Sequence, residues 1–339
     1  MKGVILVENS FVHPYMPNSV PENKKAMLDE LGINSVEDIY KSIIPDELLY
    51  KERLDIPEPI RSEYELKRHV MGILNRDITT EEYTSFLGAG CYKHQVPAIC
   101  DEINSRGEFL TAYCGDTYSD HGKMQAIFEY TSMMGELLDT DVVSYTTYDG
   151  GQAVASSLRM AVRAVREKGM AGKVILVPKT MNPEIYSQVV QYCRNVAEVR
   201  KIAYEPETGL MDLEELKEQL AKKNVAAVFF ENPTYLGNFE TRGEEIAKLA
   251  HDAGAYCVVQ TEVAALGIME SPVNQGADIV CGDIQPLGMH IQFGGGQAGF
   301  IACNQNMDLV EQFPTYMYGI TETEKEDTYG WGRAMNYRS

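Results

Sequence analysis

The sequence has 339 residues, of which 44% are hydrophobic and 24% charged, and its formal net charge is −20. A chain of this length can bury a large core, either in one α/β domain or in two smaller ones. The acidic balance argues against nucleic-acid binding, because proteins neutralise phosphates with lysine and arginine gathered on one face.

The N-terminal apolar run, residues 3–7, is too short for a signal peptide, and no later run approaches the length of a membrane span. Seven cysteines occur without a C-x-x-C pair or a metal-ligand spacing, and they lie mostly in apolar runs. Such cysteines are typical of reduced, buried thiols. The sequence therefore predicts a cytoplasmic protein with no membrane partner, no nucleic-acid partner and no metal site.

Residues 1–80 are charged and have the periodicity of helices. A proline opens a predicted helix over 21–31, Ser35 and Asp38 have the spacing of a helix cap, and a serine opens a further helix over 62–74. The region lacks the strand alternation of a domain core. We therefore predict a helical N-terminal arm that wraps another surface.

Two long loops follow, at 85–97 and 108–122, and both are rich in tyrosine, histidine and cysteine. Loops of this length and composition are uncommon unless they line a site or an interface. The alternative is that they are irregular surface loops. The residues expected to face a substrate or an interface are Tyr92, His94, Tyr113 and His121.

Strand and helix patterns alternate from residue 141 onward. Short apolar strands separated by helices of ten or more residues predict a mainly parallel sheet with helices on both faces. The strands are expected at 142–146, 173–177, 198–203, 225–230, 256–260, 277–281 and 298–302. We predict a large domain over 81–310, and a C-terminal segment over 311–339 that looks truncated.

The sequence Tyr148-Asp149-Gly150-Gly151 lies between a predicted strand and a predicted helix. In doubly wound sheets ligands bind at the carboxyl ends of strands, and small residues there let backbone N–H groups approach an anion. Tyr148, Gly150 and Gly151 are therefore candidates for a cofactor-binding site, a phosphate cradle. A plain strand-to-helix turn explains them equally well.

The loop within 281–300 contains a triple glycine between two apolar runs. In a pyridoxal-phosphate enzyme on an α/β scaffold, a loop in this place holds the lysine that binds the cofactor as a Schiff base. After Lys223 the sequence has only Lys248, in a predicted helix, and Lys325, in a charged loop. The scaffold therefore has the pattern of a cofactor enzyme without its covalent anchor.

At two further positions the sequence lacks the residue that a pyridoxal-phosphate enzyme of this fold requires. Asn182 lies where an aromatic ring would stack on the cofactor, and an amide does not replace that face. Glu262 follows the strand at 256–260 two residues late for a carboxylate that keeps the pyridine nitrogen protonated. No Ser-His-Asp set and no metal-ligand set can be placed, so no catalytic residue is predicted.

Long segments resemble one known family, the glycine dehydrogenase (decarboxylating) P-protein of the glycine cleavage system, and within it subunit 1, the alpha or N-terminal half. The segments that carry the resemblance lie at 35–60, 85–98, 105–113, 124–151, 250–259 and 276–300. It implies a type I pyridoxal-phosphate-dependent transferase-like fold. The family also continues past residue 339 into a smaller C-terminal domain.

The resemblance implies a non-catalytic alpha subunit. Its partners would be subunit 2 (beta), which carries the Schiff-base lysine and the pyridoxal phosphate, and the lipoylated H-protein, whose lipoyl arm receives the aminomethyl group of decarboxylated glycine. No cofactor would be covalently bound to this chain. Tyr92, His94 and Tyr113 would lie within reach of the partner's cofactor.

Residues 114–122, CGDTYSDHG, differ from the family's usual sequence at this place. If this loop lies over the partner's cofactor, the complex could act on an amino acid other than glycine. A structural or regulatory protein descended from the fold and a self-sufficient pyridoxal enzyme are the remaining alternatives.

Overall fold

The structure is a computed structural model that describes residues 12–50, 52, 54–84, 86, 93–109, 121–170, 172–292 and 297–334. The chain divides into two units, Met1–Ile78 and Thr79–Ser339. The predicted domain boundaries after residues 80 and 310 stay predictions.

The first unit contains α1 (Pro21–Leu31), α2 (Val36–Lys41) and α3 (Glu63–Leu74). Local chemistry sets their bounds, because Ser35 and Asp38 form a capping box at α2 and the Ser62 hydroxyl accepts a hydrogen bond from the first turn of α3. The predicted helices are confirmed. None of the described residues in this unit is buried, so its helices have no core of their own.

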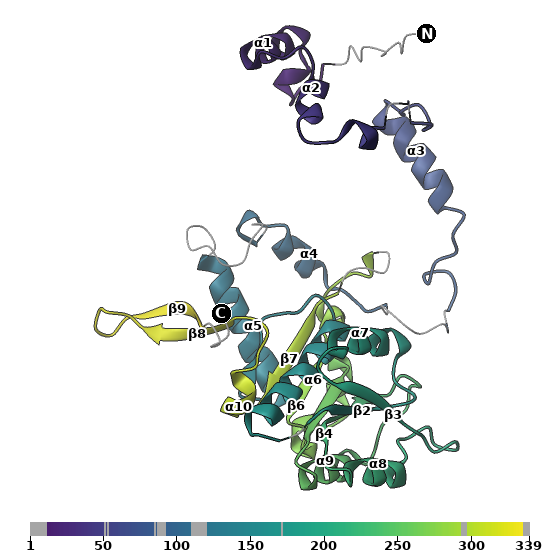
Figure 1. The fold of residues 1–339 in the computed structure, drawn as a ribbon, viewed down its shortest axis with the longest axis vertical. Coiled ribbons are helices and arrows are strands. Elements are labelled where there is room, and N and C mark those ends of the chain that lie inside the picture. The colour runs from purple at the N-terminus through teal and green to yellow at the C-terminus, as the bar shows by residue number, and fades with distance from the viewer. Residues whose placement is uncertain are drawn as a thin grey trace. The chain divides into compact units, whose positions relative to one another are not determined.

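The second unit is built on a seven-stranded sheet with the order β1-β7-β6-β5-β4-β2-β3 (Figure 1). Strands β2 to β6 pair in parallel, whereas β7 runs antiparallel to both β6 and β1. The strands are β1 (Val142–Val143), β2 (Val174–Pro178), β3 (Glu198–Ile202), β4 (Val225–Asn232), β5 (Tyr256–Thr261), β6 (Ile279–Asp283) and β7 (Gly299–Cys303). The predicted mainly parallel sheet is confirmed.

Helices cover both faces of this sheet, which explains why the inner strand β2 is apolar and buried throughout. The edge strand β3 carries charged residues and is partly exposed. Along β2, Ile175 and Val177 pack into the core beneath α6 and α7, whereas Val174 and Leu176 pack into the core beneath α5, α8 and α9. The helices of the unit are α4 (Ala98–Asn104), α5 (His121–Leu138), α6 (Gly150–Glu167), α7 (Pro183–Cys193), α8 (Leu213–Leu220), α9 (Gly243–Asp252) and α10 (Met307–Val310). No helix in the described ranges is long and apolar enough to cross a membrane.

Two elements differ from the sequence-based expectation. Strand β1 ends at Val143 rather than at residue 146, because its pairing with β7 continues only as an isolated bridge between Thr147 and Gly299. After α10 the chain forms an antiparallel hairpin, β8 (Met317–Glu322) and β9 (Tyr329–Ala334), which the sequence did not predict.

Candidate functional site

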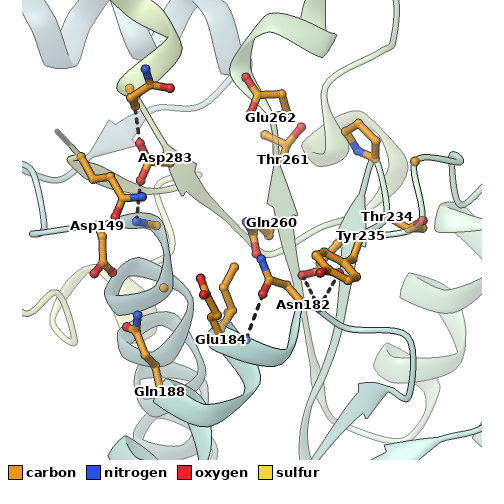
Figure 2. Close-up of a pocket in the computed structure, with 18 of the residues that line it drawn as sticks. Asp149, Asn182, Glu184, Gln188, Thr234, Tyr235, Gln260, Thr261, Glu262 and Asp283 are labelled. Carbon is orange, nitrogen blue, oxygen red and sulfur yellow. Dashed lines mark hydrogen bonds between the residues drawn. The ribbon is translucent and has the colours of Figure 1, made fainter. Parts of the chain in front are cut away.

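A pocket of about 570 Å³ lies where the carboxyl ends of β4, β5 and β6 meet the N-terminal ends of α6 and α7. This is the edge at which doubly wound sheets bind ligands. Figure 2 shows Asp149 and Asp283 on one side, Glu184 and Gln188 on α7, and Gln260, Thr261 and Glu262 at the end of β5.

Strand register brings the polar residues of this pocket together. Glu231 on β4 pairs with Gln260 on β5, and Gln260 pairs in turn with Cys281 on β6. One step further along, Asn232 pairs with Thr261. Because parallel strands end at one edge, the polar residues that follow each apolar run converge there, although they lie far apart in sequence.

The N-terminus of α6 is already bound by carboxylates of the same chain. The Gly150 N–H donates to the Asp283 Oδ2 at 2.9 Å, and the Gln152 N–H donates to the Asp149 Oδ1 at 2.6 Å. A Cβ atom at Gly150 would lie 3.1 Å from the Asp283 Cβ, so the lack of a side chain at Gly150 favours the close approach of Asp283. This contact favours the strand-to-helix turn over the phosphate cradle that the sequence left open.

Glu231 is a buried carboxylate on the pocket wall, with only 5% of its surface exposed. It accepts hydrogen bonds from the Asn182 N–H at 3.1 and 3.3 Å. Burial raises the pKa of Glu231 to about 7, while backbone N–H groups of Asn182 and Tyr235 act in the opposite direction. The Asn182 side chain caps α7 by accepting from the Glu184 N–H at 3.0 Å.

Two further carboxylates of the pocket are partly withdrawn from water. Burial raises the pKa of Glu262, while the Ala264 N–H and the nearby His94 lower it. Burial also raises the pKa of Asp283, against hydrogen bonds from backbone N–H groups that include those of Gln285 and Gly150. Glu262 therefore lies in the pocket, a position that its place in the sequence did not establish.

Three buried polar atoms of the pocket wall have no hydrogen-bond partner in the part of the chain that the structure describes. They are His94 Nε2, Gln260 Oε1 and Thr261 Oγ1. Native proteins pair nearly all of their buried polar groups, so three in one pocket require an explanation.

The structure places the site residues predicted from the sequence in different environments. His94, Gly150 and Gly151 line the pocket, whereas the Tyr148 side chain is 86% exposed. His121 is the first residue of α5, and Tyr92 and Tyr113 lie outside the described residues, as does the triple glycine at 294–296. The roles proposed for Tyr92, Tyr113 and His121 therefore stay predictions.

Sequence reasoning did not select four residues that the fold brings into the pocket, namely Glu231, Asp283, Glu184 and Gln188. Glu231 and Asp283 could have been found, because each is the first carboxylate after an apolar run that becomes a strand. The two residues on α7 carry no comparable signal.

The pocket does not fit pyridoxal phosphate. Its described lining contains no lysine for a Schiff base and no arginine for the phosphate, and Leu287 stands in the turn where the lysine was expected. The N–H group of Gly150 is taken by Asp283. A phosphate dianion would meet carboxylates instead of donors, so no step of a pyridoxal reaction can be assigned to this pocket.

Across the described residues, no group of three or more His, Cys, Asp or Glu side chains is placed to hold a metal ion.

Comparison with known proteins identifies the family. The protein family described as "Glycine cleavage system P-protein" matches residues 13–336, which is nearly the whole chain. The chain belongs to the glycine cleavage system P-protein family.

Curated relatives of this P-protein chain are named probable glycine dehydrogenase (decarboxylating) subunit 1. The relative from Pyrococcus horikoshii is 38% identical over 91% of this chain and 67% of its own length. Those from Staphylothermus marinus and Carboxydothermus hydrogenoformans are 35% and 37% identical, over 92% and 96% of this chain and 66% and 70% of their own lengths. The chain thus spans about two thirds of the length of the curated relatives that it matches.

Solved structures agree with this assignment. Glycine decarboxylase (P-protein) of the glycine cleavage system, in an inhibitor-bound form, is similar with a TM-score of 0.78 and 30% identity, over 96% of this chain and 69% of that chain. The sphingosine-1-phosphate lyase of Burkholderia pseudomallei shares the fold alone, with a TM-score of 0.56 and 13% identity over 85% of this chain and 67% of that chain. The expected type I pyridoxal-phosphate-dependent transferase-like fold is confirmed.

Proposed function

We propose that this chain is the non-catalytic alpha subunit of a split P-protein, which decarboxylates glycine and passes the aminomethyl group to the lipoyl arm of the H-protein. The observation that carries the proposal is a P-protein chain whose own strand-end pocket does not fit the cofactor. In the described lining there is no Schiff-base lysine, and Asp283 occupies the helix N-terminus where a phosphate would bind. The names of the curated relatives, subunit 1, agree with it.

In this proposal the pyridoxal phosphate and its lysine belong to the beta subunit. The first unit of the chain supports association with a partner, because it leaves large apolar side chains exposed, Ile43 and Leu48 among them. Apolar surface that a unit cannot bury by itself is typical of an interaction surface. Tyr92, His94 and Tyr113 are proposed to reach the partner's cofactor, although His94 also lines the pocket of its own chain.

Release of labelled carbon dioxide from carboxyl-labelled glycine, or exchange with labelled bicarbonate, tests this function. We expect exchange when this chain, the beta subunit and lipoylated H-protein are combined, and none when any of the three is omitted. Turnover of another amino acid but not glycine would overturn the substrate assignment. A beta subunit that is fully active alone would overturn the requirement for this chain.

The cofactor assignment has a separate test. The isolated chain, mixed with pyridoxal phosphate and treated with borohydride, is expected to retain no covalently bound cofactor. A stable reduced adduct at one site of this chain would show that it carries its own anchor.

A further inference from the structure

The strand-end pocket is lined by side chains of one charge. Five carboxylates face it, those of Asp149, Glu184, Glu231, Glu262 and Asp283. Among the described lining residues His94 is the only group that can become a cation. A concave surface lined by one sign of charge raises the local concentration of ligands of the opposite sign.

Unpaired polar atoms are a second, independent feature of the same pocket. Thr261 is only 1% exposed, and its hydroxyl has no hydrogen-bond partner among the residues that the structure describes. The Gln260 Oε1 and the His94 Nε2 are likewise buried without one in the described part of the chain. A carbonyl oxygen and a hydroxyl both accept hydrogen bonds, so these atoms suit a ligand that donates N–H groups.

The usual anion site of such a fold is closed. The first N–H groups of α6 already bind Asp283 and Asp149, and both carboxylates would repel a phosphate. An inorganic cation is also unsuited, because no three metal-ligating side chains among the described residues come close enough together to hold one. A volume of about 570 Å³ is in the range of pockets that bind small organic molecules.

We propose that this pocket binds a small organic ammonium compound, an alkylamine or diamine, in place of the cofactor of the fold family. Glu231 and Glu262 form charge-assisted hydrogen bonds with its amino groups, and Gln260 and Thr261 accept from the remaining N–H groups. Asp283 stays bound to α6 and adds negative charge to the wall. This inference does not depend on the substrate of the complex.

Calorimetric titration of the full chain with 1,4-diaminobutane tests it. We expect saturable binding of one ligand per chain. The matched ligand is 1,4-butanediol, which has the same carbon skeleton and no charge, and it is expected to bind at least tenfold more weakly. Pyridoxal phosphate and inorganic phosphate are expected not to bind in this pocket.

Variants locate the binding site. Glu262→Gln, at a half-buried position, is expected to weaken the binding of 1,4-diaminobutane roughly tenfold or more, because it removes a charge-assisted hydrogen bond. Thr261→Val keeps the shape of the side chain and is expected to weaken binding to a smaller extent. The control is Glu218→Gln, an identical change of charge at an exposed position on α8, which should leave the affinity unchanged.

Thermal melting of each variant establishes that it is folded, and Thr261→Val provides a second measurement if Glu262→Gln is not. The proposal is overturned if the diol binds as tightly as the diamine, if phosphate or pyridoxal phosphate saturates the pocket, or if Glu262→Gln and Glu218→Gln bind the diamine equally. Absence of diamine binding at millimolar concentration to the folded wild-type chain also overturns it. Saturation of the pocket by pyridoxal phosphate would also contradict the cofactor assignment made above. The other outcomes do not bear on glycine turnover, so those failures are distinct from failure of the proposed function.

Discussion

Two carboxylates of similar burial on or beside β4 have different surroundings. Glu240 lies 3.1 Å from the Arg242 guanidinium, whereas Glu231 accepts hydrogen bonds from backbone N–H groups on a wall lined by other acids. Burial raises the pKa of Glu231 to about 7. Because this buried carboxylate is poorly solvated, the folded chain loses stability whenever Glu231 is ionised.

The pH dependence of Glu231→Gln tests this. In the unfolded chain the carboxyl titrates near its ordinary pKa of 4.5, well below the folded value of about 7. Between these values the folded chain holds the extra proton, so the free energy of unfolding falls as pH rises, and the loss is complete above the folded pKa. Glu231→Gln removes this loss, by at most about 3 kcal/mol at pH 8 and little at pH 4.

Urea unfolding at pH 4, 6 and 8 measures the effect. The advantage of Glu231→Gln over wild type should grow with pH, and Glu218→Gln should show no such trend. An advantage that is constant across this range would mean that Glu231 titrates normally.

Gly150 provides a second test at the residue scale. Its Cα lies against Asp283, where an added Cβ would come within 3.1 Å of the Asp283 Cβ and 3.2 Å of its backbone nitrogen. We expect Gly150→Ala to destabilise the chain by about 1–3 kcal/mol, since overpacking displaces β6 or α6. The control is Gly267→Ala, because a Cβ there meets no atom within 4 Å. Equal urea midpoints for the two variants would contradict the close contact.

At the scale of elements, the sequence alone was sufficient to predict a helix or strand where residues within that element or next to it determine its structure. Helix α7 is an example, because Pro183 at its first position and the Asn182 side-chain cap mark its start. The apolar strands β2, β4, β5 and β6 were equally easy to predict, since two helical layers require apolar residues on both faces. The predictions that were wrong concerned features set by pairing with distant segments. One example is the end of β1, which is set by its pairing with β7.

Prediction of the pocket from the sequence was limited in the same way, by contacts between distant segments. Gly150 and Gly151 were found because a strand-to-helix turn is visible in sequence, but the partner of Gly150 is Asp283, 133 positions away. Sequence could indicate a cradle without indicating that a carboxylate fills it. The acidic character of the wall likewise arises only when the ends of β4, β5 and β6 are placed side by side.

The hairpin of β8 and β9 is held to α5 by a ring contact, with the centroids of Phe128 and Trp331 5.0 Å apart. We expect Trp331→Ala to lower the free energy of local opening by about 1 kcal/mol, which is roughly fivefold less protection from hydrogen exchange over residues 317–334. Tyr329→Ala, on the same strand but at a position that is 68% exposed, is the control. Equal protection in the two variants would show that the hairpin does not depend on this contact.

At the scale of the whole molecule, the two units differ in how they can be stable. The unit Thr79–Ser339 has two extensive apolar cores, one on each face of its sheet. The unit Met1–Ile78 has helices with well-formed caps but no buried residue among those described. Short helices without tertiary packing are marginal in water, so we expect another surface to stabilise this unit.

The double variant Ile43→Ser/Leu48→Ser tests whether the proposed partner subunit is that surface. These side chains are 71% and 72% exposed in the isolated chain, so their loss should leave its thermal melting unchanged. If they are buried against the partner, affinity for the beta subunit should fall at least tenfold, because buried apolar anchors dominate interface energy. The control, Glu30→Ser/Glu47→Ser, alters exposed charged residues of the same arm and should weaken association far less. Equal affinities for the two double variants, measured by titration with the beta subunit, would mean that the arm is stabilised elsewhere.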